Sequence, residues 1–422
     1  MTPGFQEHAK HMNAVVAAVL KASDPREATA RAVRGRLSDW GLVFAVGKAA
    51  AAMARGFKEC GGIDCWPPCV ITPEDADHPV PTERNVLAAE RVLEAIESWR
   101  HSKYRDDGGN LVLLLSGGAS ALLTLPAPGL TVDDVAEVTS ALLRAGAPIE
   151  DLNSVRKHID MLKGGWLAKH VAPKRVEQFV LSDVLGDRLD VIGSGPCVPD
   201  PTTYADAIAV LDRSEVWDAA ARVRAYLEAG ARGKHPETPK PGDPVFDGVR
   251  TTIVGSNAMA VDAAVAALRS ERFEVRLIER GVVGEAVAAG RRLGAAAKGL
   301  DRGHAIVWGG ETTVTVGVAK GIGGRNQELA LAAAIEIDGA PNCAVATFAT
   351  DGVDGPTDAA GAMVTGESCR HARSLGMDPR AFLSDHDSHT IFARLDVADW
   401  PHLIRTGPTG TNVNDVAVAL RY

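Results

Sequence analysis

The chain has 422 residues, of which 46% are apolar and 23% are charged, as in an ordinary globular protein. Its net charge of −9 argues against nucleic acid as a partner, so any anionic substrate must be met by a local basic pocket. The sequence has no apolar run of roughly 18 residues, and its first residues, MTPGFQEHAKH, lack the apolar core of a signal peptide. We therefore expect no contact with a membrane and predict a cytoplasmic location.

The first half of the chain is predicted to alternate between helices and strands, which favours a doubly wound, mostly parallel α/β sheet. Its most hydrophobic run, residues 111–115, is expected to be a central strand buried on both faces. In such sheets, ligands bind at the carboxyl ends of the strands. The residues that directly follow each strand are therefore the first candidates for a site. The strands are expected at 40–46, 69–72, 111–115 and 176–181.

Two candidate anion sites follow strands in this half. Lys48 stands at the start of a helix, where a cation is electrostatically unfavourable, so a bound anion would explain it. The sequence Ser116-Gly117-Gly118-Ala119-Ser120 follows the central strand and could present backbone N–H groups and hydroxyls to a phosphate. The bland alternatives are an exposed lysine and an ordinary strand-to-helix turn.

Further candidates lie in the segments that follow. His78 is a candidate substrate contact in a loop, although most such histidines are structural. A helix is expected from 152 to 165, which would place Arg156 and Lys163 on one face, either near an anionic ligand or in solvent. Asp183 and Asp187 follow the strand at 176–181, where two carboxylates either hold Mg²⁺ together with substrate phosphates or cap the loop.

The segment at 231–247 is polar and rich in Pro, Gly and Lys, so it predicts a linker. It would separate an α/β domain at 1–240 from a second α/β region at 250–422. Two strand–helix units are expected to open this second region, at 251–268 and 274–297.

Residues 305–329, AIVWGGETTVTVGVAKGIGGRNQEL, contain a third candidate anion site. A buried strand at 305–308 leads through two glycines to Glu311. The alternation of hydroxyl and apolar residues at 312–318 predicts a half-buried strand.

The loop that follows is rich in glycine, with Lys320, Gly323 and Gly324, and it opens a helix at Arg325-Asn326-Gln327-Glu328. Converging backbone N–H groups, the helix dipole and the two cations favour a bound anion. The alternative is a hairpin turn with two solvated cations.

Three acidic residues, Asp351, Asp354 and Asp358, follow a strand expected at 342–349. They lack the bidentate Glu of an EF-hand calcium loop. The chain contains no G-x-x-x-x-G-K-[ST], no G-x-G-x-x-G after a strand, no H-E-x-x-H and no G-x-S-x-G. These absences count against a P-loop enzyme, an ordinary NAD(P) domain, a zinc protease and an α/β-hydrolase.

Taken together, the motifs resemble the type II glycerate kinase family, the glycerate 2-kinases with a C-terminal MOFRL domain. The resemblance covers nearly the whole chain. It rests on VGKAA at 46–50, HPVP at 78–81, LLSGGASALL at 114–123, LNSVRKHID at 152–160 with KGG at 163–165, LSDVLGD at 181–187, GSGP at 193–196, GGETTVTV at 309–316, GGRNQELAL at 323–331, TDGVDGPTDAAGA at 350–362 and PTGTNVND at 408–415.

This resemblance implies transfer of the ATP γ-phosphate to a hydroxyl of D-glycerate, typically giving 2-phosphoglycerate. It implies a large α/β domain and a smaller MOFRL domain, about 303–415, with the active site in a cleft between them. The implied cofactors are ATP and Mg²⁺. The expected partners are these small molecules and a second copy of the chain in a homodimer, with no nucleic acid and no membrane.

The resemblance also suggests roles for the candidate residues. Lys48 and Arg325 would contact the transferring phosphate or the glycerate carboxylate, and Asp351 or Asp183 would orient the attacking hydroxyl or hold Mg²⁺. Phosphate or nucleotide binding is expected at Ser116, Gly117, Gly118, Ser120, Lys320, Gly323 and Gly324; substrate binding at His78, Asn153, Arg156, Asn326 and Glu328; and metal binding at Asp183, Asp187 and Glu311.

Two positions depart from the family pattern, and two other functions stay open. Arg188 stands where another acid or a small residue is common, and Cys197 stands where Thr is expected. Loss of a ligand-binding hydroxyl at Cys197 would change the substrate preference. Some relatives carry the label hydroxypyruvate reductase, and a non-catalytic sugar-acid-binding protein would keep the same site.

Overall fold

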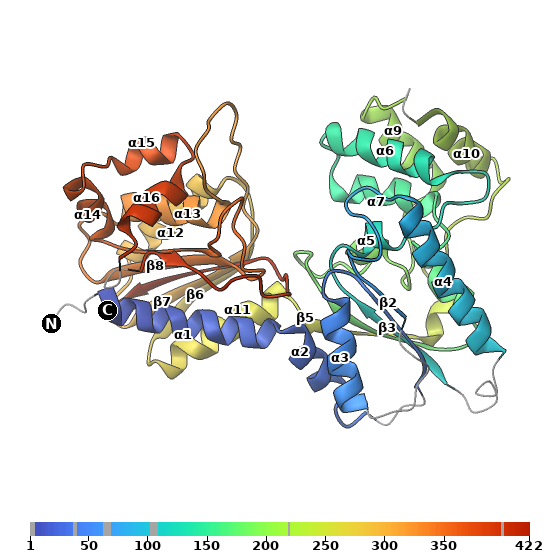
Figure 1. The fold of residues 1–422 in the computed structure, drawn as a ribbon, viewed down its shortest axis with the longest axis horizontal. Helices are drawn as coiled ribbons and strands as arrows, with labels where there is room; N and C mark the ends of the chain where they lie inside the picture. The colour runs from blue at the N-terminus through green and yellow to red at the C-terminus, as the bar shows by residue number, and fades with distance from the viewer. Residues whose placement is uncertain (1–4, 37–39, 62–68, 102–108, 218–219, 398–400) are drawn as a thin grey trace. The chain divides into compact units, whose positions relative to one another are not determined.

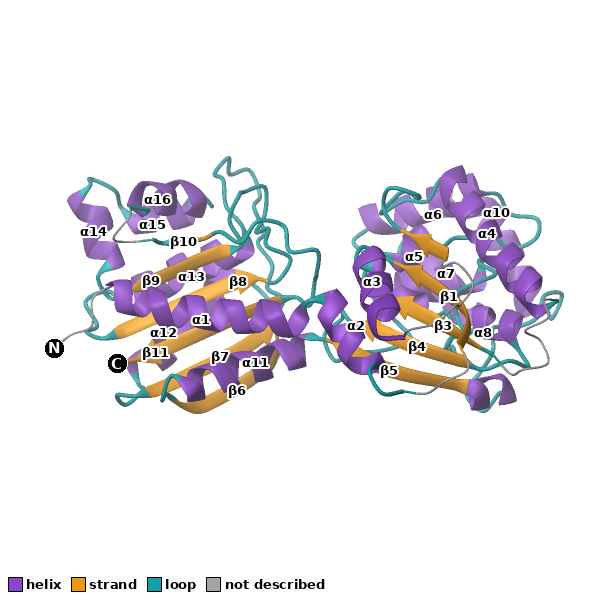
Figure 2. Ribbon diagram, turned by 60° about the horizontal axis from the view of Figure 1, so that its bottom comes forward, coloured by secondary structure: helices purple, strands orange, loops and turns teal. Residues whose placement is uncertain are grey.

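The computed structural model describes residues 5–36, 40–61, 69–101, 109–217, 220–397 and 401–422. The chain forms two compact units, which Figures 1 and 2 show as separate groups of helices and strands. We call Pro25–Val254 the parallel-sheet unit. We call Met1–Asp24 together with Gly255–Tyr422 the mixed-sheet unit.

The parallel-sheet unit is built on five strands in the order β2-β1-β3-β4-β5. Strand β1 pairs in parallel with β2 and β3, and β3 pairs in parallel with β4. The predicted central position of β3 is confirmed, because its residues 111–114 are fully buried. The strands are β1 (Trp40–Val46), β2 (Cys69–Ile71), β3 (Asn110–Leu115), β4 (Val176–Leu181) and β5 (Val249–Gly255).

Two groups of helices complete this unit (Figure 1). The first group packs on the sheet and consists of α3 (Ala50–Gly61), α4 (Glu83–Arg100), the short α5 (Ala119–Leu122) and α8 (Trp166–Val171), with α2 (Pro25–Val33) packed against α3. The second has a core of its own and consists of α6 (Val132–Arg144), α7 (Ile149–His158), α9 (Tyr204–Arg213) and α10 (Ala221–Ala231). Threonine caps fix where α4, α6 and α9 begin, because each accepts a backbone N–H of the first turn.

The mixed-sheet unit has six strands in the order β10-β9-β8-β11-β7-β6. Only β6 and β7 pair in parallel, and the other neighbours are antiparallel. The strands are β6 (Glu274–Val282), β7 (His304–Gly310), β8 (Cys343–Ala349), β9 (Gly361–Thr365), β10 (Leu403–Ile404) and β11 (Asp415–Arg421).

Helices cover both faces of the mixed sheet (Figure 1). The helices α1 (Phe5–Ser23) and α11 (Asn257–Ser270) lie on one face, and the remaining helices lie on the other: α12 (Ala286–Lys298), α13 (Arg325–Glu336), α14 (Ser368–Ser374), α15 (Pro379–Ser384) and α16 (Ser388–Leu395). Close packing of α12 on α13 requires Gly290, because a Cβ there would collide with the Leu329 carbonyl oxygen. No helix in the described part of the chain is long and apolar enough to span a bilayer.

The first helix lies outside the domain in which the sequence placed it. We expected residues 1–240 to form one domain, but α1 packs against α11 of the mixed-sheet unit. Met12, Val15 and Val19 of α1 are buried. The Thr411 hydroxyl also donates to the Ser23 carbonyl at 2.7 Å. The partners of α1 lie more than 200 residues away along the chain, so no local pattern identifies them.

The expected linker at 231–247 is part of the parallel-sheet unit. Thr238 is buried, and its hydroxyl donates to Asp200 Oδ2 at 3.0 Å. Phe246 packs against the core beneath the sheet. The division between the units falls between Val254 and Gly255. Polar composition therefore misidentified a packed loop as a linker.

Two predicted elements are wrong in part. Residues 312–318 form no strand and make only one bridge, between Thr313 and Glu285, because no neighbouring strand supplies a ladder of partners. The helix expected from 152 to 165 is α7, which ends at His158. Lys163 therefore does not share a helix face with Arg156.

The lowered pKa of His8 should make the stability of the fold depend on pH. His8 is buried on α1, with its ring centroid 4.1 Å from that of Tyr422. Burial, aided by the charge of His11, lowers the pKa of His8 from 6.5 to about 4. The unfolded chain therefore takes up a proton at a higher pH than the folded chain does. The stability from neutral His8 is complete above pH 6.5 and is lost as the pH falls towards 4, by about 3 kcal/mol.

The measurement is the urea-unfolding free energy at several pH values between 4 and 7. His8→Leu is expected to flatten the curve in this window, and His101→Leu, at an exposed position, is the control. An unchanged slope in His8→Leu would contradict the assignment.

Candidate functional site

Four loops meet at the carboxyl edge of the parallel sheet. Lys48 follows β1, the loop with His78 follows β2, Gly117 and Gly118 follow β3, and Asp183 follows β4. These strands are neighbours in the sheet. Strand β1 pairs in parallel with β2 and β3, and β3 pairs in parallel with β4, so their carboxyl ends lie side by side. The structure thus brings these sequence-predicted residues together.

Backbone contacts lock the turns after β1 and β3 to each other. Lys48 N–H donates to the Gly117 carbonyl at 2.9 Å, and Ala49 N–H donates to Ser116 Oγ at 3.1 Å. Gly47 has φ +123°, and a Cβ there would collide with Ser116. Ser116 is only 1% exposed, so its hydroxyl supports the turn and is not placed to contact a ligand. Ser120 is half-buried beside the glycines.

Three basic side chains gather at this edge. A Cβ on Gly118 would lie 3.3 Å from Lys48 Cγ and 3.6 Å from His78 Cδ2. Burial, together with the charges of Lys48 and Arg156, lowers the pKa of His78, which favours its neutral form. We call Lys48, His78 and Arg156 the basic cluster.

Arg156 is a buried cation that has neither a hydrogen bond nor an ion pair among the residues that the structure describes. It is only 7% exposed, and burial lowers its pKa to about 10, although the charge of Asp160 opposes this. Within the described residues, neither Arg156 nor Lys48 has a side-chain hydrogen bond or an ion pair. A buried guanidinium that makes no hydrogen bond or ion pair is unfavourable unless an anion binds to it. The basic cluster is therefore a candidate anion site.

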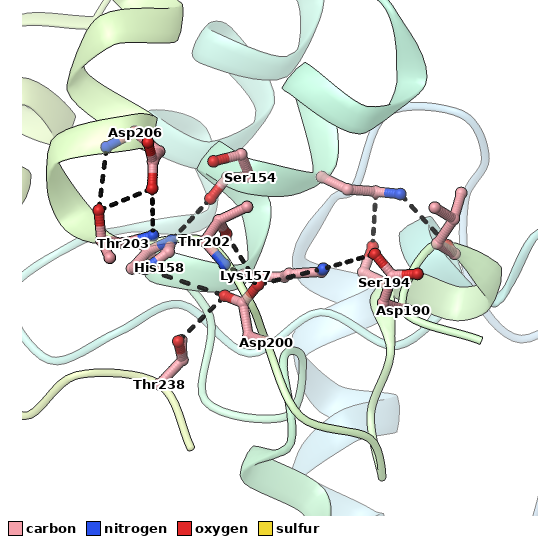
Figure 3. Close-up of polar contacts among 12 residues, drawn as sticks. Ser154, Lys157, His158, Asp190, Ser194, Asp200, Thr202, Thr203, Asp206 and Thr238 are labelled. Atoms are coloured by element: carbon pink, nitrogen blue, oxygen red, sulfur yellow. Dashed lines mark hydrogen bonds and ion pairs between the residues drawn. The ribbon is translucent and has the colours of Figure 1, made fainter. Parts of the chain in front are cut away.

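Helix α7, which carries Arg156, is anchored by its other polar side chains (Figure 3). Lys157 Nζ lies 3.3 Å from Asp200 Oδ1 and 3.9 Å from Asp190 Oδ2. Asn153 donates to the Val191 carbonyl at 3.2 Å and accepts from Ser194 Oγ at 2.8 Å. The sequence suggested that Asn153 binds substrate. In the structure Asn153 is buried by these contacts, so it anchors the helix and is not placed to bind substrate.

Asp183 is the best-placed predicted metal ligand. A Cβ on Gly117 would collide with its carboxylate, so this acid borders the glycine turn. Asp187 lies in a turn with φ 54°. No group of three or more His, Cys, Asp or Glu side chains could hold a metal ion in the described part of the chain. Mg²⁺ that arrives with a nucleotide needs only one or two carboxylates, so Asp183 fits this use.

The two departures from the family pattern differ in their surroundings. Arg188 is exposed, and its Nη2 lies 2.8 Å from Asp190 Oδ2. Cys197 is fully buried in the core beneath the sheet, and burial raises the pKa of its thiol. The Cys197 thiol is therefore not placed to contact a ligand, whereas the exposed Arg188 guanidinium is paired with Asp190.

In the mixed-sheet unit, Arg325 is neutralised by two carboxylates. Its Nε and Nη2 donate to the two oxygens of Asp415 at 2.6 and 2.9 Å, and its Nη1 lies 3.1 Å from Glu311 Oε1. Burial acts to lower the pKa of Arg325, but hydrogen bonds and charge from these acids outweigh it and raise the pKa. Burial raises the pKa of Asp415 to about 6, although Arg325 opposes this. The predicted free cation at Arg325 is therefore an internal ion pair.

The predicted anion site at the start of α13 is filled by the protein itself. Asp354 accepts the backbone N–H groups of Asn326 and Gln327 at 2.9 and 2.8 Å. A Cβ on Gly324 would collide with Asp354, which is 1% exposed. Asn326 is buried too, where it accepts from Thr347 Oγ1 at 2.5 Å. Asn326 is thus not placed to contact a substrate.

Of the other predicted residues of this unit, four line one pocket, whereas Lys320 and Asp351 do not. Glu328 contacts His386 and lines a pocket together with Gly323, Gly324 and Glu311. Lys320 is exposed on the preceding loop and is not part of that pocket. Asp351 shapes a turn by accepting Val353 N–H at 3.0 Å.

Three residues with clear structural roles, Asp354, Asp415 and His386, were not assigned as site residues from the sequence. Asp354 belongs to the aspartate-rich segment after β8, and Asp415 ends the sequence NVND. These two positions were visible in the motifs, but their partners in space were not.

A parallel α/β sheet whose carboxyl edge carries basic side chains without ion pairs among the described residues is suited to binding a small anion. Family models match the chain over residues 11–228 ("Domain of unknown function (DUF4147)") and 304–415 ("MOFRL family"). A relative named D-glycerate 2-kinase, from Thermotoga maritima, is 38% identical over 399 residues, covering 90% of each chain. The chain belongs to the type II glycerate kinase family.

Two further comparisons bear on this assignment. A crystal structure titled as a glycerate kinase from Thermotoga maritima matches with a TM-score of 0.87 at 35% identity, covering 99% of this chain and 100% of that one. A relative from Agrobacterium vitis, named putative hydroxypyruvate reductase, is 37% identical over 423 residues, covering 96% of this chain and 92% of the relative. Relatives under both names are thus similar along most of the chain.

Proposed function

We propose that the protein is a D-glycerate 2-kinase, which transfers the γ-phosphoryl group of ATP to the 2-hydroxyl of D-glycerate. The observation that carries the proposal is the unpaired, buried charge of Arg156 beside Lys48 and His78 at the carboxyl edge of the parallel sheet. Both substrates are anions, and the basic cluster supplies the positive charge that an anion requires.

Phosphoryl transfer depends on positioning and on neutralising charge more than on covalent catalysis. In our proposal, Lys48 and Arg156 neutralise the transferring phosphoryl group or the glycerate carboxylate. The backbone N–H groups of Gly117 and Gly118 orient phosphate oxygens. Asp183 would hold the Mg²⁺ that accompanies ATP, and this ion would supply further neutralisation of the phosphates. Neutral His78 can donate a hydrogen bond to a substrate oxygen or accept one from a substrate hydroxyl.

The alternative is an NAD(P)H-dependent hydroxypyruvate reductase, the activity in the name of the Agrobacterium vitis relative. A reductase needs a bound hydride donor, and no G-x-G-x-x-G follows a strand in this sequence. The kinase is therefore favoured. The cytoplasmic location and the homodimer stay predictions from the sequence.

The test is ADP release by the purified protein with Mg-ATP, with and without D-glycerate. We expect release that depends on D-glycerate, and ³¹P NMR should show the phosphate at position 2. Oxidation of NADPH with hydroxypyruvate, without any ADP release, would replace the kinase with the reductase. Binding of D-glycerate without either reaction would indicate the non-catalytic alternative.

A further inference from the structure

The mixed-sheet unit contains a pocket of about 640 Å³ that the proposed phosphate chemistry does not use. Its walls come from the loop between β7 and α13, the first turns of α13, the turn at Gly355 and Pro356, and His386. This volume is typical of sites for small organic molecules.

The pocket does not suit a phosphate. Its one arginine, Arg325, is already paired with Asp415 and Glu311. The N–H groups at the start of α13 are already bonded to Asp354. Glu311 and Glu328 line the pocket, and the carboxylates of Asp415 and Asp354 contact its lining, so four carboxylates stand against Arg325 and a protonated His386. Negative potential of this kind repels anions and favours neutral groups that donate hydrogen bonds.

Glu328 offers an acceptor that the protein leaves unused. Its side chain is only 3% exposed, and Oε2 lies 2.8 Å from His386 Nδ1, which donates to it. Its other oxygen, Oε1, is buried without a hydrogen-bond partner in the described part of the chain. A buried carboxylate oxygen without a partner is unfavourable, so a donor from a ligand would stabilise this arrangement.

Part of the pocket lining is apolar. It consists of Val314, Val316 and Pro356, and Val316 is 45% exposed although its side chain is aliphatic. A ligand for this pocket therefore has a flat or apolar part for these side chains and hydroxyl or amino groups for Glu328 and Glu311.

We propose that this pocket binds the nucleoside part of the nucleotide substrate. The base packs on Val314, Val316 and Pro356, and the ribose hydroxyls or the amino group donate to Glu328 and Glu311. D-Glycerate also has hydroxyl groups, but its carboxylate is repelled by these acids and its three carbons leave the apolar side chains uncovered. The proposal rests on the proposed kinase function, because that function supplies a nucleotide.

The experiment measures binding of adenosine, which has no phosphate, to the full chain by isothermal titration calorimetry. Val316→Glu places a charge against the base and is expected to weaken adenosine binding by roughly tenfold or more. Val318→Glu is the matched control, because Val318 lies on the same loop, is 99% exposed and does not line the pocket. This control is expected to bind adenosine like the wild type.

A second variant tests the polar half of the pocket. Wild type is expected to bind adenosine more tightly than 2′-deoxyadenosine or 3′-deoxyadenosine, and Glu328→Gln is expected to reduce this preference. Absence of adenosine binding by the wild type would overturn the proposal, and so would equal adenosine binding by Val316→Glu and Val318→Glu. A Val316→Glu protein that loses binding of D-glycerate but keeps binding of adenosine would overturn it as well. Glycerate-dependent ADP release by the wild type is measured separately, so failure of this inference is distinguishable from failure of the kinase function.

Discussion

Replacing Arg156 with Met is expected to lower kcat/KM by about 10²–10³-fold without lowering the free energy of unfolding. The guanidinium is buried and has no ion pair in the described part of the chain, so folding gains nothing from its charge. Met keeps most of the apolar stem and removes the charge that is costly to bury. Arg156→Met should therefore lower kcat/KM and leave the free energy of unfolding unchanged or higher.

Steady-state kinetics with ATP and D-glycerate, together with urea unfolding, make this measurement. Arg144→Met is the matched control, because Arg144 lies on the exposed side of α6. This control should leave kcat/KM within about twofold of the wild type. A large loss of stability in Arg156→Met would show that an internal partner neutralises the charge, and would remove Arg156 as the anion ligand.

Replacing Arg325 with Met is expected to destabilise the fold by about 3–5 kcal/mol, because Asp415 loses its bidentate partner. Asp415 is 7% exposed, and burial raises its pKa to about 6 even with Arg325 present. Without the guanidinium, the pKa of Asp415 should rise further. The Asp415 carboxyl would then remain buried either as a charge without its arginine partner or as a neutral acid. Activity of this variant would then report on unfolding as well as on chemistry.

The double variant Arg325→Met/Asp415→Asn separates these effects. Removing the stranded carboxylate should recover much of the lost stability, as measured by urea unfolding. Kinetics of the recovered protein then report what Arg325 contributes to the reaction. Equal stability of Arg325→Met and the wild type would contradict the role of the ion pair.

The fold was predictable where the determinants are local. Apolar runs gave the positions of β1, β3 and β4, and an Ala- and Leu-rich segment after Arg325 gave α13. The strand predicted at 312–318 was wrong. Alternation of hydroxyl and apolar residues shows that a segment could form a half-buried strand, but not that a neighbouring strand exists to pair with it. The helix at 152–165 was extended too far for a related reason, since apolar residues continue through the turn after His158.

The site was predictable to a similar extent. The common location of Lys48, Gly117 and Asp183 at one sheet edge was predictable, because each follows directly after a strand of a parallel sheet. Arg325 could not be interpreted in this way, because Asp415 is 90 residues away in the sequence. The composition of a loop shows which charges it carries, whereas only the tertiary fold shows which of them remain unpaired.

The position of α1 has a consequence for synthesis on the ribosome. The 230 residues of Pro25–Val254 separate this helix from α11 and from the sheet that it covers. At typical elongation rates, its buried valines wait roughly 10–50 s for a partner after they are made. The parallel-sheet unit is completed within that interval. Helix α1 is therefore translated well before the elements that it packs against, and for that time its apolar face is a natural substrate for chaperones.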